Sequence, residues 1–258
     1  MISHKWAKQI KSLHLKKNRK AEQQFIVEGE KAVLEVLASG WRVPALFATE
    51  GFLQQHPEAI QTALQVHTCS SEDLVKVGTF TSNDAALALV SMPQWPSFQA
   101  TPEQWTLVLD NINDPGNLGT IIRIADWYGI QHILCSANTA DCYNPKVVAA
   151  AKGSFLRVQL HYLALPEVLA NSHLPVYGAY LGGENIHQLS LTKPGGFIVL
   201  GNEANGISKE VGQCISRKIT IPAFGDAESL NVGIAAAIIC DNLQRLTAAG
   251  ELGYTEAN

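Results

Sequence analysis

Three short segments in the C-terminal half hold the residues whose types and spacing are suited to chemistry. They cover residues 111–123, 200–208 and 221–232 and are rich in Gly, Asn and small polar residues. Each has an apolar run before it and a helix-like stretch after it, so each is expected to be a loop at the carboxyl end of a strand. Ligands bind at that edge of an open α/β sheet, and three such loops can line one site.

The first segment combines a turn with an arginine. Asp114-Pro115-Gly116-Asn117 is a turn signature in its own right, which a purely structural role would explain. Arg123 follows within about two turns of the predicted helix and has apolar neighbours on both sides. Because an arginine is costly to bury unless it meets an anion, Arg123 favours a functional interpretation.

The other two segments exclude common nucleotide-binding loops. Residues 201–208 nearly match the phosphate-binding loop, but Ile207 stands where its lysine is required and Glu203 would repel phosphate. The glycine fingerprint of dinucleotide-binding folds is also missing. The second loop therefore suits a neutral or cationic ligand. Structural alternatives are that Ser208 caps the next helix and that Ser229 or Asn231 caps the last one.

Size and composition are those of an ordinary globular protein. The 258 residues, 47% hydrophobic and 16% charged, fit one large or two medium domains. Five cysteines without a C-x-x-C pair argue against a disulfide framework and against a zinc site. The N-terminus lacks an apolar signal region, and no apolar stretch approaches bilayer length, so a cytoplasmic location is expected.

The N-terminus is strongly basic although the whole chain has a net charge of -4. Such asymmetry predicts a basic arm that meets a polyanion, whereas the alternative is a solvated face that keeps the protein soluble. A helix over residues 5–13 would place Trp6, Ile10 and Leu13 on its packed face and lysines on the other. The basic residues of this arm are Lys5, Lys8, Lys11, Lys16, Lys17, Arg19 and Lys20.

Strand-like and helix-like segments alternate along the chain, which predicts an α/β protein. Prolines at 93, 96 and 102 exclude a central strand or a helix interior, so residues 93–103 are predicted to link a domain of residues 1–92 to one of residues 104–258. Strands are expected at 25–27, 43–48, 65–68, 85–90, 105–109, 132–135, 176–180, 197–200 and 218–221. Helices are expected at 30–38, around 53–64, from 71, up to about 129, at 145–151 and at 231–248.

The three segments together resemble the TrmH (SpoU) family of the SPOUT superfamily of RNA methyltransferases. The matching motifs are N-x-x-D-P-G-N-x-G-x-x-x-R at 111–123, L-G-N-E-x-x-G-x-S at 200–208 and I-P-x-x-G-x-x-E-S-L-N-V at 221–232. They occur in the family's order, the similarity extends over about residues 105–250, and residues 144–148 resemble a further family segment. Residues 11–29 resemble the small substrate-binding domain, similar to ribosomal protein L30e, that many members carry.

The resemblance implies a parallel sheet with a C-terminal deep trefoil knot, preceded by a smaller α/β L30e-like domain. It implies that S-adenosylmethionine is bound in a bent form, at Leu200, Gly201, Ile221 and Leu230. It also implies a homodimer formed through the SPOUT domain, with an active site that takes residues from both subunits. Neither a metal nor a membrane is expected.

The implied reaction is methylation of a ribose 2′-hydroxyl in RNA. The family's proposed role for Arg123 is to take the proton, but arginine effectively stays protonated, which favours phosphate orientation and stabilisation of the developing alkoxide. Asn117 would position the ribose or Arg123, and Glu203, Ser229 and Asn231 would complete the site. The basic N-terminal residues would contact RNA phosphates.

The expected substrate is ribosomal RNA rather than transfer RNA, because of the additional N-terminal domain. Alternatives are a non-catalytic RNA-binding protein of the same fold and a dinucleotide-dependent oxidoreductase, which lacks its fingerprint. The chain departs from the family pattern at four positions. Gly233 replaces the usual Ser, Ala204 replaces Gly, and Ala150 and Ala151 replace polar residues that are often Arg and Ser.

Overall fold

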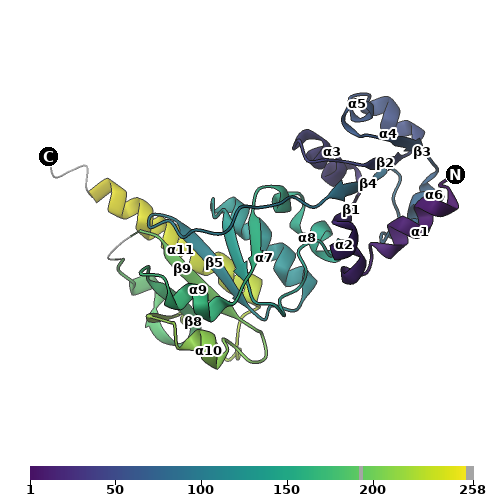
Figure 1. The fold of residues 1–258 in the computed structure, drawn as a ribbon. Coiled ribbons are helices and arrows are strands. Elements are labelled where there is room, and N and C mark those ends of the chain that lie inside the picture. The colour runs from purple at the N-terminus through teal and green to yellow at the C-terminus, as the bar shows by residue number, and fades with distance from the viewer. Residues whose placement is uncertain (192–193, 254–258) are drawn as a thin grey trace. The chain divides into compact units, whose positions relative to one another are not determined.

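The computed structural model describes residues 1–191 and 194–253 (Figure 1). The chain forms two compact units. Unit 1 comprises Met1–Trp95 and Asp141–Leu156, and unit 2 comprises the remainder of the chain. The proline-rich stretch of residues 92–104 contains neither helix nor strand, as expected of a connecting segment. The domain boundaries given above stay a prediction.

Unit 1 is built on a four-stranded sheet in the order β1-β4-β2-β3. Strand β4 is antiparallel to both of its neighbours, whereas β2 and β3 are parallel. The two central strands are almost completely buried, which explains their continuous apolar sequences. The strands are β1 (Gln24–Glu28), β2 (Ala45–Ala48), β3 (Val66–Thr68) and β4 (Ala86–Ser91).

Short helices surround this sheet. The helix expected around residues 53–64 is two helices instead, because Pro57 interrupts it. Ser70 and Asp73 form a capping box that begins α6 near the predicted start. The helices are α1 (His4–Ser12), α2 (Lys16–Glu22), α3 (Glu30–Ala38), α4 (Glu50–Gln55), α5 (Ala59–Thr62), α6 (Ser71–Val77), α8 (Pro145–Ala151) and the 3-10 turn η1 (Ser154–Leu156).

Helix α1 has the predicted two-faced character. Ile10 and Leu13 are fully buried in the core of unit 1, and the Trp6 ring meets the Phe47 ring edge-on at 5.5 Å between centroids. The lysines of α1 and α2 are exposed. The helix therefore packs on the sheet and presents its positive charge to solvent.

Arg19 corrects one prediction. Its side chain is 1% exposed, and its Nε and NH2 groups donate to Asp141 Oδ2 at 3.0 and 2.6 Å. Its NH1 group donates to the carbonyls of Leu13 and His14 at 2.8 and 2.9 Å. A guanidinium that is buried and committed in this way cannot contact an RNA phosphate, so Arg19 is a structural residue.

The segment Asp141–Leu156 packs within unit 1, although it falls in the sequence range expected for the second domain. Aromatic rings explain this packing. The Tyr143 and Phe25 ring centroids are 4.5 Å apart, and Phe155 lies 5.9 Å from Phe25 and 6.1 Å from Trp41. Such clusters bury a large apolar area, which stabilises the packing of residues 141–156 within unit 1.

Unit 2 contains a six-stranded parallel sheet in the order β10-β8-β9-β5-β6-β7. All the strands expected in this part of the chain are present. Strand β7 was not expected, because its sequence Gln-Leu-His-Tyr has no continuous apolar run. The strands are β5 (Trp105–Asp110), β6 (His132–Cys135), β7 (Gln159–Tyr162), β8 (Val176–Asn185), β9 (Gly196–Gly201) and β10 (Arg217–Thr220).

Helices cover both faces of this sheet. Val108 and Val199 pack on one face with Leu169 of α9 and Val211 of α10. On the other face α11 packs along α7, and the Trp105 indole donates to Thr247 of α11 at 3.1 Å (Figure 1). The helices are α7 (Pro115–Trp127), α9 (Leu165–Ala170), α10 (Lys209–Gly212), α11 (Val232–Gly253) and the 3-10 turn η2 (Ile186–Gln188).

Two kinds of feature are absent from the residues that the structure describes. None of the helices in this part of the chain has the length and apolar character needed to cross a membrane. Within the same residues no group of three or more His, Cys, Asp and Glu side chains lies close enough together to hold a metal ion.

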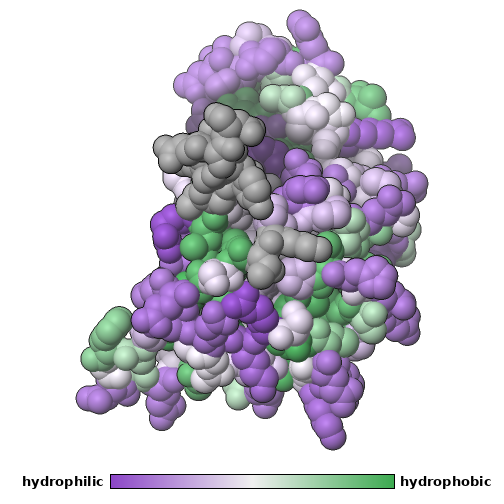
Figure 2. Space-filling view, turned by 90° about the vertical axis from the view of Figure 1, so that its left-hand side faces the viewer, coloured by the Kyte–Doolittle hydropathy of each residue, from purple (hydrophilic) through white to green (hydrophobic). Residues whose placement is uncertain are grey.

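The face shown in Figure 2 carries hydrophobic patches between hydrophilic side chains, as most protein surfaces do.

Candidate active site

The first two motif loops begin side by side. Strands β5 and β9 are neighbours, and their last residues, Asp110 and Gly201, are directly paired. The Asp110 carboxylate is 2% exposed, and it accepts hydrogen bonds from the Ser208 backbone N–H at 2.7 Å and from Asn111 Nδ2 at 3.0 Å. A buried carboxylate thus joins the start of the first loop to the end of the second.

The loop of residues 201–206 is folded tightly on itself. The Asn202 side chain donates to the Asn111 carbonyl at 2.9 Å and accepts from the backbone N–H groups of Ala204 and Asn205. A Cβ atom at Gly201 would lie 2.2 Å from the backbone carbon of Gly206, so the loop requires glycine there. Ala204, where the family usually has Gly, is exposed and lies in this turn.

One residue from each motif joins a hydrogen-bonded cluster. Asn117 Nδ2 donates to Glu203 Oε1 at 2.5 Å, and Asn231 Nδ2 donates to Asn117 Oδ1 at 2.9 Å. The cluster of Asn117, Glu203 and Asn231 therefore spans the start of α7, the loop after β9 and the start of α11. These are three of the five residues predicted to be catalytic.

Helix capping holds this cluster in place. The Asp114 side chain accepts from the Asn117 backbone N–H at 2.7 Å and begins α7, and Asn231 Oδ1 accepts from Gly233 at 2.9 Å and begins α11. Asn231 thus caps α11 and also contacts Asn117. A Cβ atom at Gly233 would lie only 3.1 Å from Thr120 Cγ2, so glycine suits the close approach of α11 to α7 at this position.

Arg123 lies outside the cluster. It is exposed on α7, between the buried residues Ile122 and Ala125, and it makes no hydrogen bond or ion pair with any described residue. Because Arg123 is not buried, the cost of burial gives it no need of an anionic partner. Its guanidinium, one turn beyond Thr120, remains able to bind an anion that approaches α7.

A cavity of about 800 Å³ lies between the second and third loops. The ends of β9 and β10, the irregular middle of β8 and the start of α11 contribute its walls. Glu203 and Ser229 line it as well, whereas Asn117, Arg123 and Asn231 are not among its lining residues. All four residues predicted to hold the cofactor line the cavity: Leu200, Gly201, Ile221 and Leu230.

The chemistry of the lining fits S-adenosylmethionine. Ile219, Val232 and Ile239 supply apolar surface for a purine, and the Glu203 carboxylate supplies negative charge for a sulfonium cation. The strand ends supply backbone groups to hydrogen-bond polar atoms. Burial raises the pKa of Tyr180, and the charge of Asp110 raises it further, so this lining phenol stays neutral.

Sequence reasoning did not single out Asp110 or Tyr180. Asp110 had a detectable signal, because a carboxylate closes an otherwise apolar strand directly before the first motif. Tyr180 had none, since it enters the cavity only through the irregular pairing of β8 with β10. The exposed lysines predicted to contact RNA belong to unit 1: Lys5, Lys8, Lys11, Lys16, Lys17 and Lys20.

Comparison with family models gives two matches. Residues 104–241 match the SpoU rRNA Methylase family, and residues 5–88 match the MRM3-like substrate binding domain. The first match covers more than half of the chain. The chain belongs to the SpoU rRNA methylase family. The family that the three motifs suggested is thereby confirmed.

Individual relatives agree along nearly the whole length. The SpoU-family chain is 31% identical over 240 residues to the 23S rRNA (guanosine(2553)-2′-O)-methyltransferase RlmP of Bacillus subtilis, covering 92% of this chain and 95% of that protein. A solved TrmH-family protein from Porphyromonas gingivalis is 37% identical, with a TM-score of 0.82 and coverage of 95% and 99%. The AdoMet complex of AviRb from Streptomyces viridochromogenes, 23% identical with a TM-score of 0.84 and coverage of 94% and 98%, shows the shared fold.

Proposed function

We propose that this SpoU-family protein transfers a methyl group from S-adenosylmethionine to a ribose 2′-hydroxyl of ribosomal RNA. The observation that carries the proposal is the meeting of all three motifs, in which Glu203 of the cavity wall is hydrogen-bonded to Asn117 and Asn117 to Asn231. The relatives support the substrate class, because RlmP and a second relative from Streptomyces viridochromogenes are named as 23S rRNA 2′-O-methyltransferases.

The cofactor would be held by Leu200, Gly201, Ile221 and Leu230. When bound, S-adenosylmethionine supplies an electrophilic methyl group on a positively charged sulfur. The protein contributes alignment, since Glu203 reaches from the cavity wall to Asn117 and fixes its amide. Asn231 orients the same amide from the opposite side, and Ser229 adds a hydroxyl to the cavity lining.

Arg123 would act on the RNA rather than on the cofactor. Its exposed guanidinium is free to pair with a phosphate beside the methylated ribose and to stabilise charge that develops on the 2′-oxygen. A role as the base is disfavoured, because a phosphate partner stabilises the protonated form.

Two finer expectations belong to this proposal. The first is the deep trefoil knot, in which the last strands and α11 thread a loop. The second is a homodimer formed by unit 2, in which the partner completes the site. The dimer is supported by Trp127 and Ile234, large apolar side chains that are 84% and 53% exposed on the packed pair α7 and α11.

Unit 1 would select the RNA. Its exposed lysines on α1 and α2 are suited to phosphate contacts, and its match to a substrate-binding domain supports this role. Action on ribosomal RNA would agree with the expected cytoplasmic location.

Two measurements test the proposal. Isothermal calorimetry with S-adenosylmethionine should show binding, and alkali-resistant nucleotides in ribosomal RNA should differ between cells with and without the protein. Binding without any difference in methylation of ribosomal or transfer RNA would favour a non-catalytic RNA-binding protein. A difference confined to transfer RNA would replace the substrate class and keep the reaction.

A further inference from the structure

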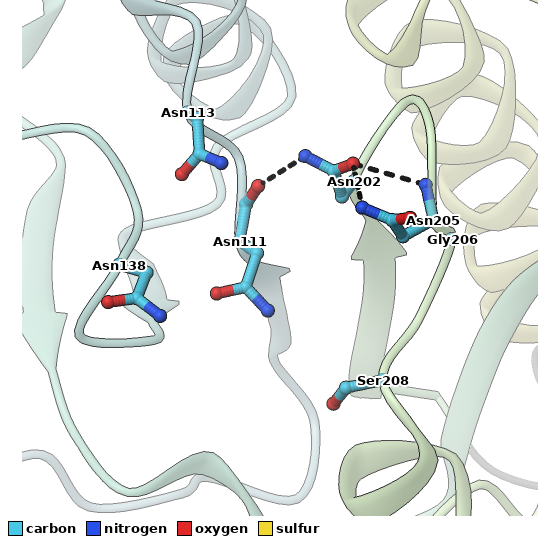
Figure 3. Close-up of a pocket in the computed structure, with 7 residues that line it drawn as sticks. All are labelled: Asn111, Asn113, Asn138, Asn202, Asn205, Gly206 and Ser208. Atoms are coloured by element: carbon cyan, nitrogen blue, oxygen red, sulfur yellow. Dashed lines mark hydrogen bonds between the residues drawn. The ribbon is translucent and has the colours of Figure 1, made fainter.

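A second, smaller cavity lies beside the cofactor cavity. It has a volume of about 340 Å³, within the range of about 300–1,000 Å³ that small-molecule sites occupy. None of its lining residues carries a charge. Five of them are asparagines, Asn111, Asn113, Asn138, Asn202 and Asn205, and Figure 3 shows how they lie.

The asparagines divide into two groups. Asn111, Asn202 and Asn205 spend their amides on hydrogen bonds that shape the two loops. Asn113 and Asn138 are exposed and make no hydrogen bond with any described residue. Both lie on the side of Asn111 away from Asn202 (Figure 3). Two amides, each with donors and an acceptor, are thus left available at this cavity.

The position of the cavity connects it to the proposed reaction. Asn202, Asn205 and Gly206 line both cavities, so one short loop forms their common wall. Asn113 directly precedes the cap of α7, whose first turn carries Asn117. The smaller cavity therefore adjoins the place where the proposed function puts the ribose.

We propose that this cavity receives the base of the nucleotide that is methylated and that Asn113 and Asn138 read its edge. Unstacked RNA bases are recognised by hydrogen bonds to their edges, and asparagine amides match base donors and acceptors. A neutral lining suits a base better than a phosphate. This inference rests on the proposed function and adds base selectivity to it.

The test uses the full-length protein and unmodified 23S ribosomal RNA, free and in ribosomal subunits. After the methylated nucleotide is mapped, transcripts that differ only in that base are compared for Asn113→Ala, Asn138→Ala and the double variant. We expect the wild type to prefer one base. Each single variant should lose about tenfold in kcat/KM on that transcript, as expected for one lost amide–base pair, and the double variant should lose more. The losses should be smaller on the other transcripts.

Two controls separate the possible results. Asn171→Ala changes an exposed asparagine of unit 2 outside the cavity and should leave the base preference intact. Calorimetry with S-adenosylmethionine should give the same affinity for the wild type and the double variant. Unchanged base preference in the double variant, or a wild type indifferent to the base, overturns the inference while methyl transfer still supports the proposed function. Absence of methyl transfer to every RNA overturns both.

Discussion

Among single residues, Arg123 offers the most direct test of the proposed contact between the site and the RNA. Arg123→Ala should lower turnover about a hundredfold or more, the range expected when one group that stabilises transition-state charge is lost. Affinity for S-adenosylmethionine should hardly change, because Arg123 does not line the cofactor cavity. Arg157→Ala, which removes an arginine paired with Asp126 on the surface, is the control. Turnover within a few-fold of the wild type would show that the role of Arg123 is wrong.

Asn117 lies at the centre of the polar cluster. Its amide nitrogen donates to Glu203, and its amide oxygen accepts from Asn231. Asn117→Asp would place a carboxylate against Glu203 and should reduce turnover more than Asn117→Ala does. Like charges raise the pKa of a carboxyl group, so lowering the pH should protonate one of the pair and partly restore the Asp variant. Rates measured between pH 8 and pH 5, relative to wild type at each pH, provide the check. Equal activity of Asp and Asn at position 117 would remove the cluster from the mechanism.

At the scale of the element, Arg19 explains how α2 is fastened to the segment before α8. Arg19→Met would leave the Asp141 carboxylate without its partner, so we expect a loss of about 3 kcal/mol in the free energy of unfolding. Urea denaturation measures this loss, and Lys20→Met, at an exposed neighbour, serves as the control. An unchanged midpoint for Arg19→Met would contradict the structural role given to this pair.

Helix α1 presents three exposed lysines along one face. If they contact RNA phosphates, the affinity that they supply should fall as the salt concentration rises. Changing Lys5, Lys8 and Lys11 to Gln should weaken binding to ribosomal RNA and reduce the slope of log K against log salt by about two. Binding titrations at several salt concentrations measure the slope, with Lys209→Gln in unit 2 as a control. If the slope stays as it is in the wild type, these lysines serve solubility alone.

Local sequence patterns predicted most elements because buried parallel strands appear as continuous apolar runs. Strands β5, β6 and β9 were found in this way, and Ser70, Asp114 and Asn144 cap helices near the predicted starts. Helix α10 begins directly after Ser208, the cap that was expected there. The short elements α2, α9 and β7 were missed. They are too short to show a period, and tertiary contacts rather than propensity hold them.

At the scale of the whole molecule, the oligomeric state is the clearest prediction. The molar mass measured by sedimentation should be twice the chain mass of 27.9 kDa. The substitution Trp127→Asp should convert the protein to a monomer with an unchanged circular dichroism spectrum. Ile60→Asp, at an apolar residue that is 50% exposed in unit 1, should leave the dimer intact. A monomeric wild type, active at concentrations where no dimer is detected, would refute a shared active site.

The sequence alone determined the family, the reaction class and the three loops that meet, because motif residues and apolar runs are local properties of the chain. Only the tertiary structure revealed that Arg19 is buried against Asp141, 122 positions along the chain, and that Asn117 bridges Glu203 and Asn231. It also revealed the asparagine-lined cavity. Partners so distant in sequence are chosen by the packing of sheets and helices, and no local pattern records that choice.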